Sequence, residues 1–191
     1  NGVYFKVAGV GNIAAYEYVR VDASTSTLVS IYPSKAYVDL KTTKAYLLME
    51  RNLYKEAEEI FKANVSQVAK LVGPDNIRYA YEIRDFADCY RQQGEYHKAQ
   101  PLYQQFAELA LRLAGKVSIE YLHASFRLAE CYYNLDNAKM AEVNHRLSVA
   151  IAKELYGANH AKYAARLLNY GIFCQREGRL TEAEKFFLEA I

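Results

Sequence analysis

Residues 83–103 read IRDFADCYRQQGEYHKAQPLY, and this stretch decides the fold. Its first half places apolar residues on one face of an α-helix, at Ile83, Phe86, Ala87 and Tyr90. Gly94 then provides a turn, because glycine adopts a positive φ at low cost. A second helix is expected from about residue 96 to residue 113, ending before Gly115. The stretch therefore predicts a helical hairpin.

This hairpin pattern recurs along the chain with a period of 42 residues. An alanine of the second helix keeps the period at Ala57, Ala99, Ala141 and Ala183. A small residue of the first helix keeps it at Ala45, Ala87, Ala129 and Gly171. A ring-bearing residue keeps it at Phe61, Tyr103, His145 and Phe187. Because neither helix of such a pair can bury its apolar face alone, the hairpins must stack, which predicts a helical solenoid.

The order of these positions resembles the tetratricopeptide repeat family. In the best-matching unit the consensus positions of that family hold Ala87, Tyr90, Gly94, Ala99 and Tyr103. The period of 42 residues, instead of about 34, is similar to the lengthened repeats of kinesin light chains. The resemblance covers about residues 34–191 and implies an all-α fold, a right-handed α-α superhelix of helical hairpins.

Two positions depart from the repeat pattern. Lys44 stands in the first unit where later units have a large apolar residue. Asp136 stands in the third unit where the second unit has its turn glycine. These two units are therefore expected to differ locally from the second.

Residues 1–32 lie outside the repeat. β-Branched and aromatic residues concentrate in 16–21 and 28–32, which predicts a β-hairpin-like segment. Because two strands alone are marginally stable, we expect this segment to pack on the first helical hairpin or to end a preceding domain. The predicted organisation is a β-rich segment over 1–32 and about four repeat units over 33–191, the last of them truncated. The start at Asn1 and the end within an apolar run favour a piece of a longer protein.

Residues 9–14 spell G-x-G-x-x-A, the dinucleotide-binding fingerprint if residues 3–7 form a strand. The fingerprint requires a helix directly after the glycines, whereas residues 16–21 have the composition of a strand. We therefore interpret the motif as a glycine turn between strands and expect no cofactor.

The composition disfavours binding to nucleic acid or to a membrane. Lysine and arginine total 24 against 22 acidic residues, so the formal charge of +2 gives no strong attraction to polyanions. The 18 tyrosines offer surfaces for base stacking, but many of them recur at repeat positions, where packing explains them. No apolar run approaches the roughly 20 residues that span a bilayer, and no signal peptide is recognisable.

The sequence contains no pattern typical of catalysis or metal binding. Three cysteines, Cys89, Cys131 and Cys174, lack C-x-x-C spacing and fall at repeat positions, which favours buried packing over reactivity. Free thiols favour a reducing compartment such as the cytoplasm, while secretion and the periplasm stay open. Paired metal-ligand spacing is absent from the histidines, which are His97, His123, His145 and His160. We expect no catalytic residue, no metal site and no enzymatic activity.

The resemblance also implies where a partner binds. In tetratricopeptide arrays the first helix of each hairpin lines a concave groove. Transferred by register, the candidate peptide-binding or protein-binding residues are Tyr81, Arg84, Asp88, Arg91, Gln92, His123, Phe126, Glu130, Tyr133, Asn134, Gln175 and Arg176. The same register adds Ala165, Leu168 and Ile172 in the fourth unit and Asp39, Thr42, Tyr46, Met49 and Glu50 in the first.

Among these residues Arg84, Arg91, Tyr133 and Arg176 are the preferred contacts, because arginine and aromatic side chains commonly anchor interfaces. The alternative for each is an ordinary solvated helix face. Arginines bind carboxylates in a bidentate manner, so an acidic peptide is the expected ligand.

The sequence thus predicts a protein-interaction scaffold that binds a peptide or protein segment. One alternative is an accessory recruitment or sensing region of a larger enzyme or regulator, whose other domains are absent from this chain. Another is self-association through the apolar edge at the C-terminal end.

Overall fold

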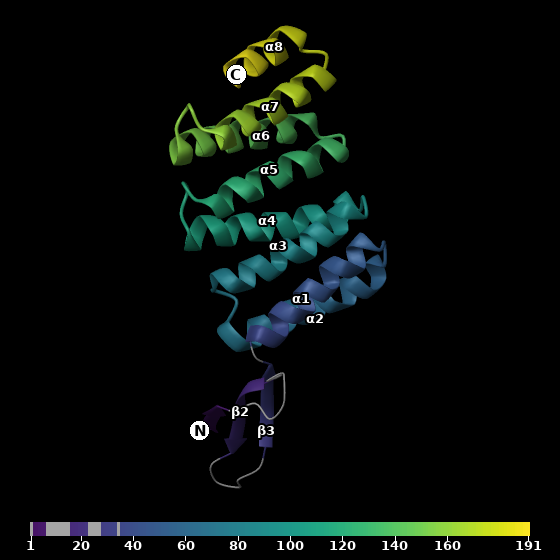
Figure 1. Ribbon diagram of the computed structural model, residues 1–191, viewed down its shortest axis with the longest axis vertical. Coiled ribbons are helices and arrows are strands. Elements are labelled where there is room, and N and C mark those ends of the chain that lie inside the picture. The colour runs from purple at the N-terminus through teal and green to yellow at the C-terminus, as the bar shows by residue number, and fades with distance from the viewer. Residues whose placement is uncertain (1, 7–15, 23–27, 34) are drawn as a thin grey trace. The chain divides into compact units, whose positions relative to one another are not determined.

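The computed structural model describes residues 2–6, 16–22, 28–33 and 35–191 (Figure 1). The chain forms two compact units. Unit 1 is Asn1–Gln93 and unit 2 is Gly94–Ile191. The predicted division into a segment 1–32 and an array 33–191 stays a prediction.

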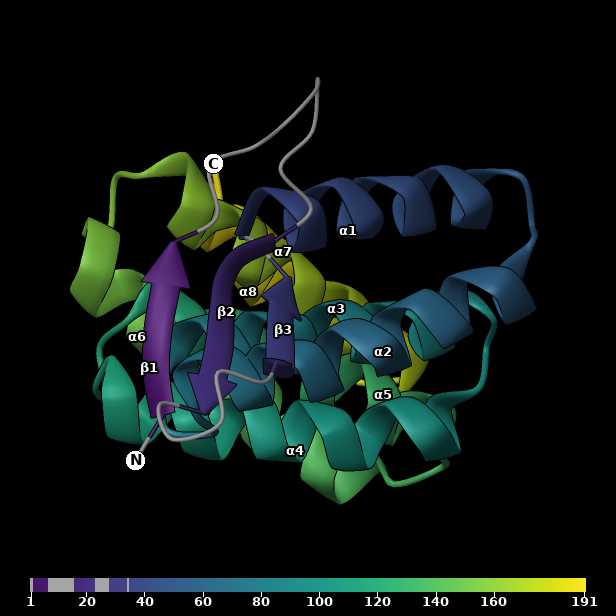
Figure 2. The same ribbon diagram turned by 90° about the horizontal axis from the view of Figure 1, so that it is seen from below.

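Unit 1 begins with a three-stranded antiparallel sheet. Its strands are β1 (Gly2–Lys6), β2 (Tyr16–Asp22) and β3 (Leu28–Pro33). Figure 2 shows β2 between β1 and β3, in agreement with the strand pairing. The two strands of the predicted hairpin are present, and β1 lies where the interpretation of the glycine motif as a turn between strands requires another strand. The motif itself, at 9–14, lies outside the described residues. β3 contacts helix α2, while the two expected roles of this segment, packing on the first hairpin or ending a preceding domain, both stay predictions.

Three helices complete unit 1, namely α1 (Lys35–Glu50), α2 (Tyr54–Val72) and α3 (Ile77–Gln92). α2 packs on both α1 and α3. Repeat positions form the core between them, with Ala45, Ala57, Phe61 and Cys89 fully buried. Lys44 is exposed on α1, so the lysine at this position does not disturb the core.

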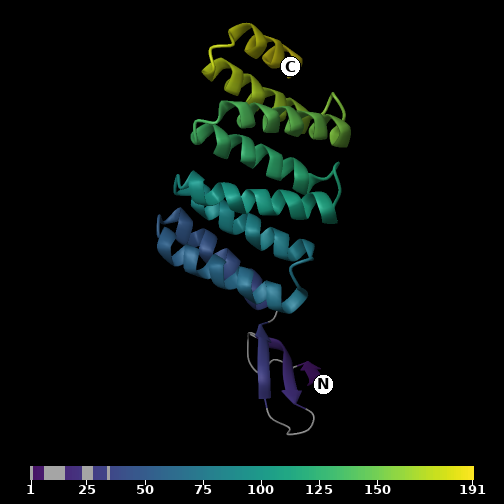
Figure 3. The ribbon, with the colours of Figure 1, turned by 180° about the vertical axis from the view of Figure 1, so that it is seen from behind.

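Unit 2 consists of five helices among its described residues, α4 (Tyr96–Leu113), α5 (Ile119–Asn134), α6 (Ala138–Tyr156), α7 (Ala161–Arg176) and α8 (Leu180–Glu189). Each helix packs against the next one along the chain (Figure 3). Ala99, Ala141 and Ala183 are at most 2% exposed, which confirms that the repeat alanines are core positions. The described helices therefore have the all-α, solenoid-type fold that the repeat predicts.

The small repeat residue at Gly171 has a clear steric reason. A Cβ atom added to Gly171 would lie 2.5 Å from Cε1 of Phe187, closer than real Cβ contacts. The ring position at Phe187 and the small-residue position at Gly171 therefore meet directly where α7 packs on α8.

The turn at Asp136 is conserved in geometry although its residue type differs. Asp136 has φ +57°, close to the value of +77° at Gly94 and +76° at Gly178. Asparagine and aspartate tolerate this left-handed conformation better than other non-glycine residues. The third hairpin therefore turns like its neighbours without a glycine.

Candidate functional site

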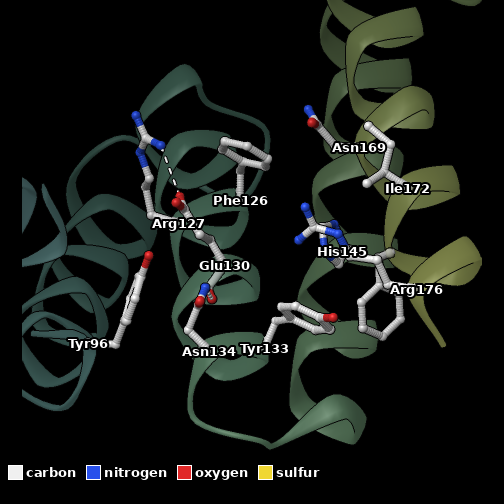
Figure 4. A pocket seen from close by; sticks show the side chains of 11 residues that line it. Tyr96, Phe126, Arg127, Glu130, Tyr133, Asn134, His145, Asn169, Ile172 and Arg176 are labelled. Carbon is white, nitrogen blue, oxygen red and sulfur yellow. Dashed lines mark hydrogen bonds and ion pairs between the residues drawn. The ribbon is translucent and has the colours of Figure 1, made fainter. Parts of the chain in front are cut away.

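A pocket of about 410 Å³ opens on unit 2 between α5 and α7. It is lined by Tyr96, Phe126, Arg127, Glu130, Tyr133, Asn134, His145, Asn169, Ile172, Phe173 and Arg176. Figure 4 shows Phe126 and Tyr133 facing Asn169, Ile172 and Arg176 across the pocket. Helical spacing explains this convergence, because residues three, four or seven apart share one face of a helix.

The register prediction and the pocket overlap in part. Phe126, Glu130, Tyr133, Asn134, Ile172 and Arg176 line the pocket, whereas His123 and Gln175 do not. Four further lining residues come from positions that the prediction did not include. They are Tyr96 at the start of α4, His145 on α6, and Asn169 and Phe173 on α7. Arg127, next to Phe126, is a fifth.

The floor of the pocket is aromatic and apolar. His145 is 6% exposed and stacks parallel to the ring of Tyr170, with 5.8 Å between the ring centroids. The ring of Phe173 lies 5.0 Å from the imidazole. Burial, and after it the nearby charge of Arg166, lowers the pKa of His145 to about 4. The imidazole is therefore neutral at pH 7, and its Nδ1 atom is buried without a hydrogen-bond partner.

Four arginines lie against the aromatic rings of this region, and one of them, Arg179 at 5.4 Å from the ring of Phe173, is paired with Glu142. The guanidinium carbon of Arg176 is 5.5 Å from the ring centroid of Tyr133. The ring of Phe126 carries two guanidinium groups, Arg166 at 4.1 Å and Arg127 at 5.5 Å. Such cation–π contacts hold the charged groups in place without neutralising them.

These arginines differ in their ion pairs. Arg127 Nη1 lies 3.1 Å from Glu130 Oε2. Within the part of the chain that the structure describes, neither Arg166 nor Arg176 has a carboxylate in ion-pair distance. The Nε atom of Arg166 is buried without a hydrogen-bond partner. Burial lowers the pKa of Arg166, and the positive charge of Arg127 lowers it further.

Two amide side chains are held at the pocket with a defined orientation. Asn134 Nδ2 donates to the main-chain oxygen of Glu130, and Asn169 Nδ2 donates to that of Ala165, both at 2.8 Å. Their Oδ1 atoms therefore remain as acceptors. An extended peptide main chain offers the N–H donors that such acceptors bind.

The corresponding surface of unit 1 is formed by α3, which carries Tyr81, Arg84, Asp88, Arg91 and Gln92. Nε and Nη2 of Arg84 donate to Oδ1 of Asp85 at 2.8 and 2.7 Å. The Nε atom of Arg91 lies 3.4 Å from Oδ1 of Asp88. Both preferred arginines of this helix are therefore already paired with an aspartate of the same helix.

Buried acids lie beside these pairs. Glu82 is 4% and Asp85 6% exposed, and the hydroxyl of Tyr46 donates to Asp85. Burial, followed by the charge of Asp85, raises the pKa of Glu82 to about 7. Arg78 Nη2 lies 3.6 Å from Oε1 of Glu82, but the Oε2 atom of Glu82 is buried without a hydrogen-bond partner. These buried acids were not predicted from the sequence. The buried face of α3 was identified from the spacing of apolar residues alone.

Among the described residues no group of three or more histidines, cysteines or acids is arranged to hold a metal ion. Burial raises the pKa of Cys89 to about 11, so this thiol is protonated at neutral pH and a weak nucleophile. No described helix combines the length and the apolar composition needed to cross a membrane.

Comparison with known protein families identifies the tetratricopeptide repeat. The sequence profile of the tetratricopeptide repeat matches residues 38–112 and 120–191.

Two curated proteins are similar in sequence. The chain is 26% identical over 178 residues to the secreted RxLR effector protein RXLR-C07 of Plasmopara halstedii, covering 81% of this chain and 54% of that protein. It is 27% identical over 103 residues to the RxLR effector protein SFI4 of Phytophthora infestans (strain T30-4), covering 54% of this chain and 30% of that protein. The chain thus spans about half or less of the length of these relatives.

Solved structures share the fold. BtubC from P. vanneervenii has a TM-score of 0.72 at 20% identity and covers 81% of this chain and 61% of its own. The structure of the nearly identical repeats of a Podosopora anserina putative kinesin light chain has a TM-score of 0.72 at 18% identity. The match covers 82% of this chain and 74% of that one. PcrH, solved in complex with the chaperone binding region of PopD, has a TM-score of 0.55 at 18% identity. The match covers 75% of this chain and 96% of PcrH. At these identities the similarity shows the fold alone.

Proposed function

Because the chain belongs to the tetratricopeptide repeat family, we propose that it is a non-catalytic interaction scaffold that binds an extended segment of a partner protein in the pocket between α5 and α7. The repeat fold is a scaffold for protein interactions. PcrH is a member of this fold whose structure contains a bound region of another protein. These facts support peptide binding as the kind of activity.

The observation that carries the proposal is the environment of Arg176. Its guanidinium group lies over Tyr133 at the pocket, without a carboxylate partner among the described residues. A carboxylate of the ligand supplies that partner and gains a charge-assisted, bidentate contact. Exposed Ile172 and half-buried Phe126 offer apolar contact area beside it. The expected ligand is an acidic segment with at least one large apolar side chain.

The main-chain contacts support an extended ligand. Oδ1 atoms of Asn134 and Asn169 are fixed on opposite helices of the pocket and accept hydrogen bonds. Peptide N–H groups satisfy such acceptors in any sequence. The amides thus hold the main chain, and the charged and aromatic groups select the side chains.

Selection from a phage-displayed library of random 12-residue peptides tests the proposal. Peptides that bind the chain are expected to be enriched in aspartate, glutamate and large apolar residues. Arg176→Glu is expected to weaken their binding at least tenfold, because it replaces the attraction by repulsion. Arg91→Glu makes the same charge change on α3 and is expected to leave binding unchanged. A loss with Arg91→Glu but not with Arg176→Glu would show that the pocket is not the binding site.

A second candidate role follows from the two curated relatives. Both are RxLR effector proteins, and one of them is named a secreted protein. We propose that the scaffold belongs to a secreted effector that acts by binding a protein outside the cell that makes it. Antibody detection in the culture medium of the producing organism, against a cell-lysis marker, tests this role. Retention of the whole signal in the cells contradicts it and favours an intracellular scaffold.

A further inference from the structure

We propose that the pair of arginines on Phe126 binds a phosphorylated side chain of the partner, so that the pocket of unit 2 reads a phosphopeptide. This inference rests on the proposed peptide-binding function and names the ligand of the same pocket. Its first support is convergence. Arg127 from α5 and Arg166 from α7 place their guanidinium groups against a single phenyl ring. Both positive charges therefore lie beside the same ring, at the edge of the pocket.

The charge balance of the site favours a dianion. Three arginines, Arg127, Arg166 and Arg176, lie over Phe126 or Tyr133, and the acid that lines the pocket beside them is Glu130. A fourth arginine, Arg179 over Phe173, is already paired with Glu142 and adds no uncompensated charge. The excess of positive charge is thus two. A phosphate monoester carries about −1.5 to −2 at pH 7 and has three terminal oxygens, whereas a single carboxylate carries −1 and has two. A phosphate can bridge two guanidinium groups in a way that one carboxylate cannot.

The local environment of Arg166 shows what an anion would relieve. This side chain is half-buried, its Nε atom lacks a partner, and the charge of Arg127 opposes its own. Phe126 holds the guanidinium group in place but leaves its charge uncompensated. A bound anion supplies hydrogen-bond acceptors and removes the repulsion. The site is therefore organised for anion binding before the ligand arrives.

The spacing along α7 adds a prediction about the ligand sequence. Arg166 and Arg176 are ten residues apart on one helix, which corresponds to about 15 Å at a rise of about 1.5 Å per residue. An extended peptide covers this distance in about four to five residues. We expect a phosphorylated residue and an acidic residue separated by four to five positions.

Defined synthetic peptides test this inference by fluorescence anisotropy. Each probe is a labelled 12-residue peptide pool with a fixed central residue, which is phosphoserine, phosphotyrosine, serine or glutamate. The other positions are randomised. At least one phosphorylated pool is expected to bind ten or more times more tightly than the serine pool, and the two phosphorylated pools show which side chain carries the phosphate. A second series places one glutamate at each distance from the phosphoresidue in an otherwise neutral peptide.

Variants then separate the contributions of single arginines. Arg166→Gln and Arg127→Gln are each expected to abolish the preference for phosphate. Arg176→Gln is expected to keep that preference but to lose the optimum for glutamate four to five positions away. Arg112→Gln, an equal charge change outside the pocket, serves as control and is expected to match the unchanged chain. Circular dichroism confirms that each variant is folded, and two independent arginine variants guard against a folding defect in one.

The outcomes distinguish this inference from the proposed function. Equal binding of phosphorylated and serine pools, with loss of binding in Arg176→Gln, overturns the phosphate inference and leaves peptide binding in place. Phosphate preference that persists in both Arg166→Gln and Arg127→Gln also overturns it. Absence of binding by every pool contradicts the proposed function as well.

Discussion

The arginines of α3 in unit 1 and of α7 in unit 2 belong to the first helix of their hairpins but have different surroundings. On α3, Arg84 is held by Asp85 and Arg91 by Asp88. On α7, Arg166 and Arg176 lie over aromatic rings and have no carboxylate partner among the described residues. A paired arginine contributes to the folded chain, whereas an unpaired one is available to a ligand. Residue type alone therefore does not identify a binding arginine.

The acid that pairs with Arg84 gives the largest expected effect. Asp85→Ala leaves the half-buried guanidinium of Arg84 and the hydroxyl of Tyr46 without their acceptor, and should destabilise unit 1 by about 3 kcal/mol. Glu130→Ala removes the more exposed partner of Arg127 in unit 2 and should cost only about 0.5 kcal/mol. Hydrogen exchange read by mass spectrometry on peptides of α3 and α5 measures both effects separately. If Asp85→Ala and Glu130→Ala destabilised their units equally, the two arginine–acid pairs would not differ in their contribution to stability.

A pH effect of opposite sign in the two units sharpens the comparison. In unit 1 the pKa of Glu82 is raised to about 7 in the folded chain, from an ordinary value of 4.5. The unfolded chain releases this proton first, so the stability of unit 1 falls as pH rises from about 4.5 to 7, by about 2 kcal/mol. Glu82→Gln cannot ionise, and its stability relative to the unchanged chain should rise over this range. A difference between the two chains that is constant with pH, measured by urea unfolding, would contradict the buried-carboxyl account.

In unit 2 the corresponding group is His145. Its pKa is lowered from 6.5 to about 4 by burial and by Arg166. The unfolded chain binds this proton first, so stability is lost as pH falls from about 6.5 to 4, by about 2 kcal/mol. His145→Phe introduces the side chain that Phe61 and Phe187 have at this repeat position. The variant should lose less stability than the unchanged chain as pH falls from 6.5 to 4. Hydrogen exchange of α6 peptides at pH 4.5 and 6.5 measures the change, and an equally steep acid loss in the variant would exclude His145 as its cause.

Much of the fold followed from spacing. The 42-residue interval identified the buried alanines and the small residue at Gly171, because stacking imposes the same steric demand on every hairpin. The left-handed turn at Asp136 was not predicted, since the conformation is set by the chain on both sides and aspartate tolerates it.

The site was predicted less completely. Register placed Phe126, Tyr133 and Arg176 at the pocket, because helical geometry fixes which residues share a face. It missed Arg166, whose long side chain reaches across to a ring on another helix, and this contact has no fixed offset in the sequence. The sequence did not show that Arg84 is paired and Arg176 is not, because each is directly followed by an acid, Asp85 and Glu177. Only the side-chain geometry separates them, since Arg84 bonds to Asp85 whereas Arg176 lies over Tyr133.

The contact between Gly171 and the ring of Phe187 bears on how freely the repeats can be exchanged. By sequence the four hairpins resemble interchangeable cassettes, since they share their landmark residues. Yet a first helix with alanine at this position, transplanted onto α8, would place a methyl group where the Phe187 ring now lies. Gly171 and Phe187 must therefore be transferred together when a repeat is moved. Engineered arrays built from this chain should be cut between hairpins, and not between the two helices of one.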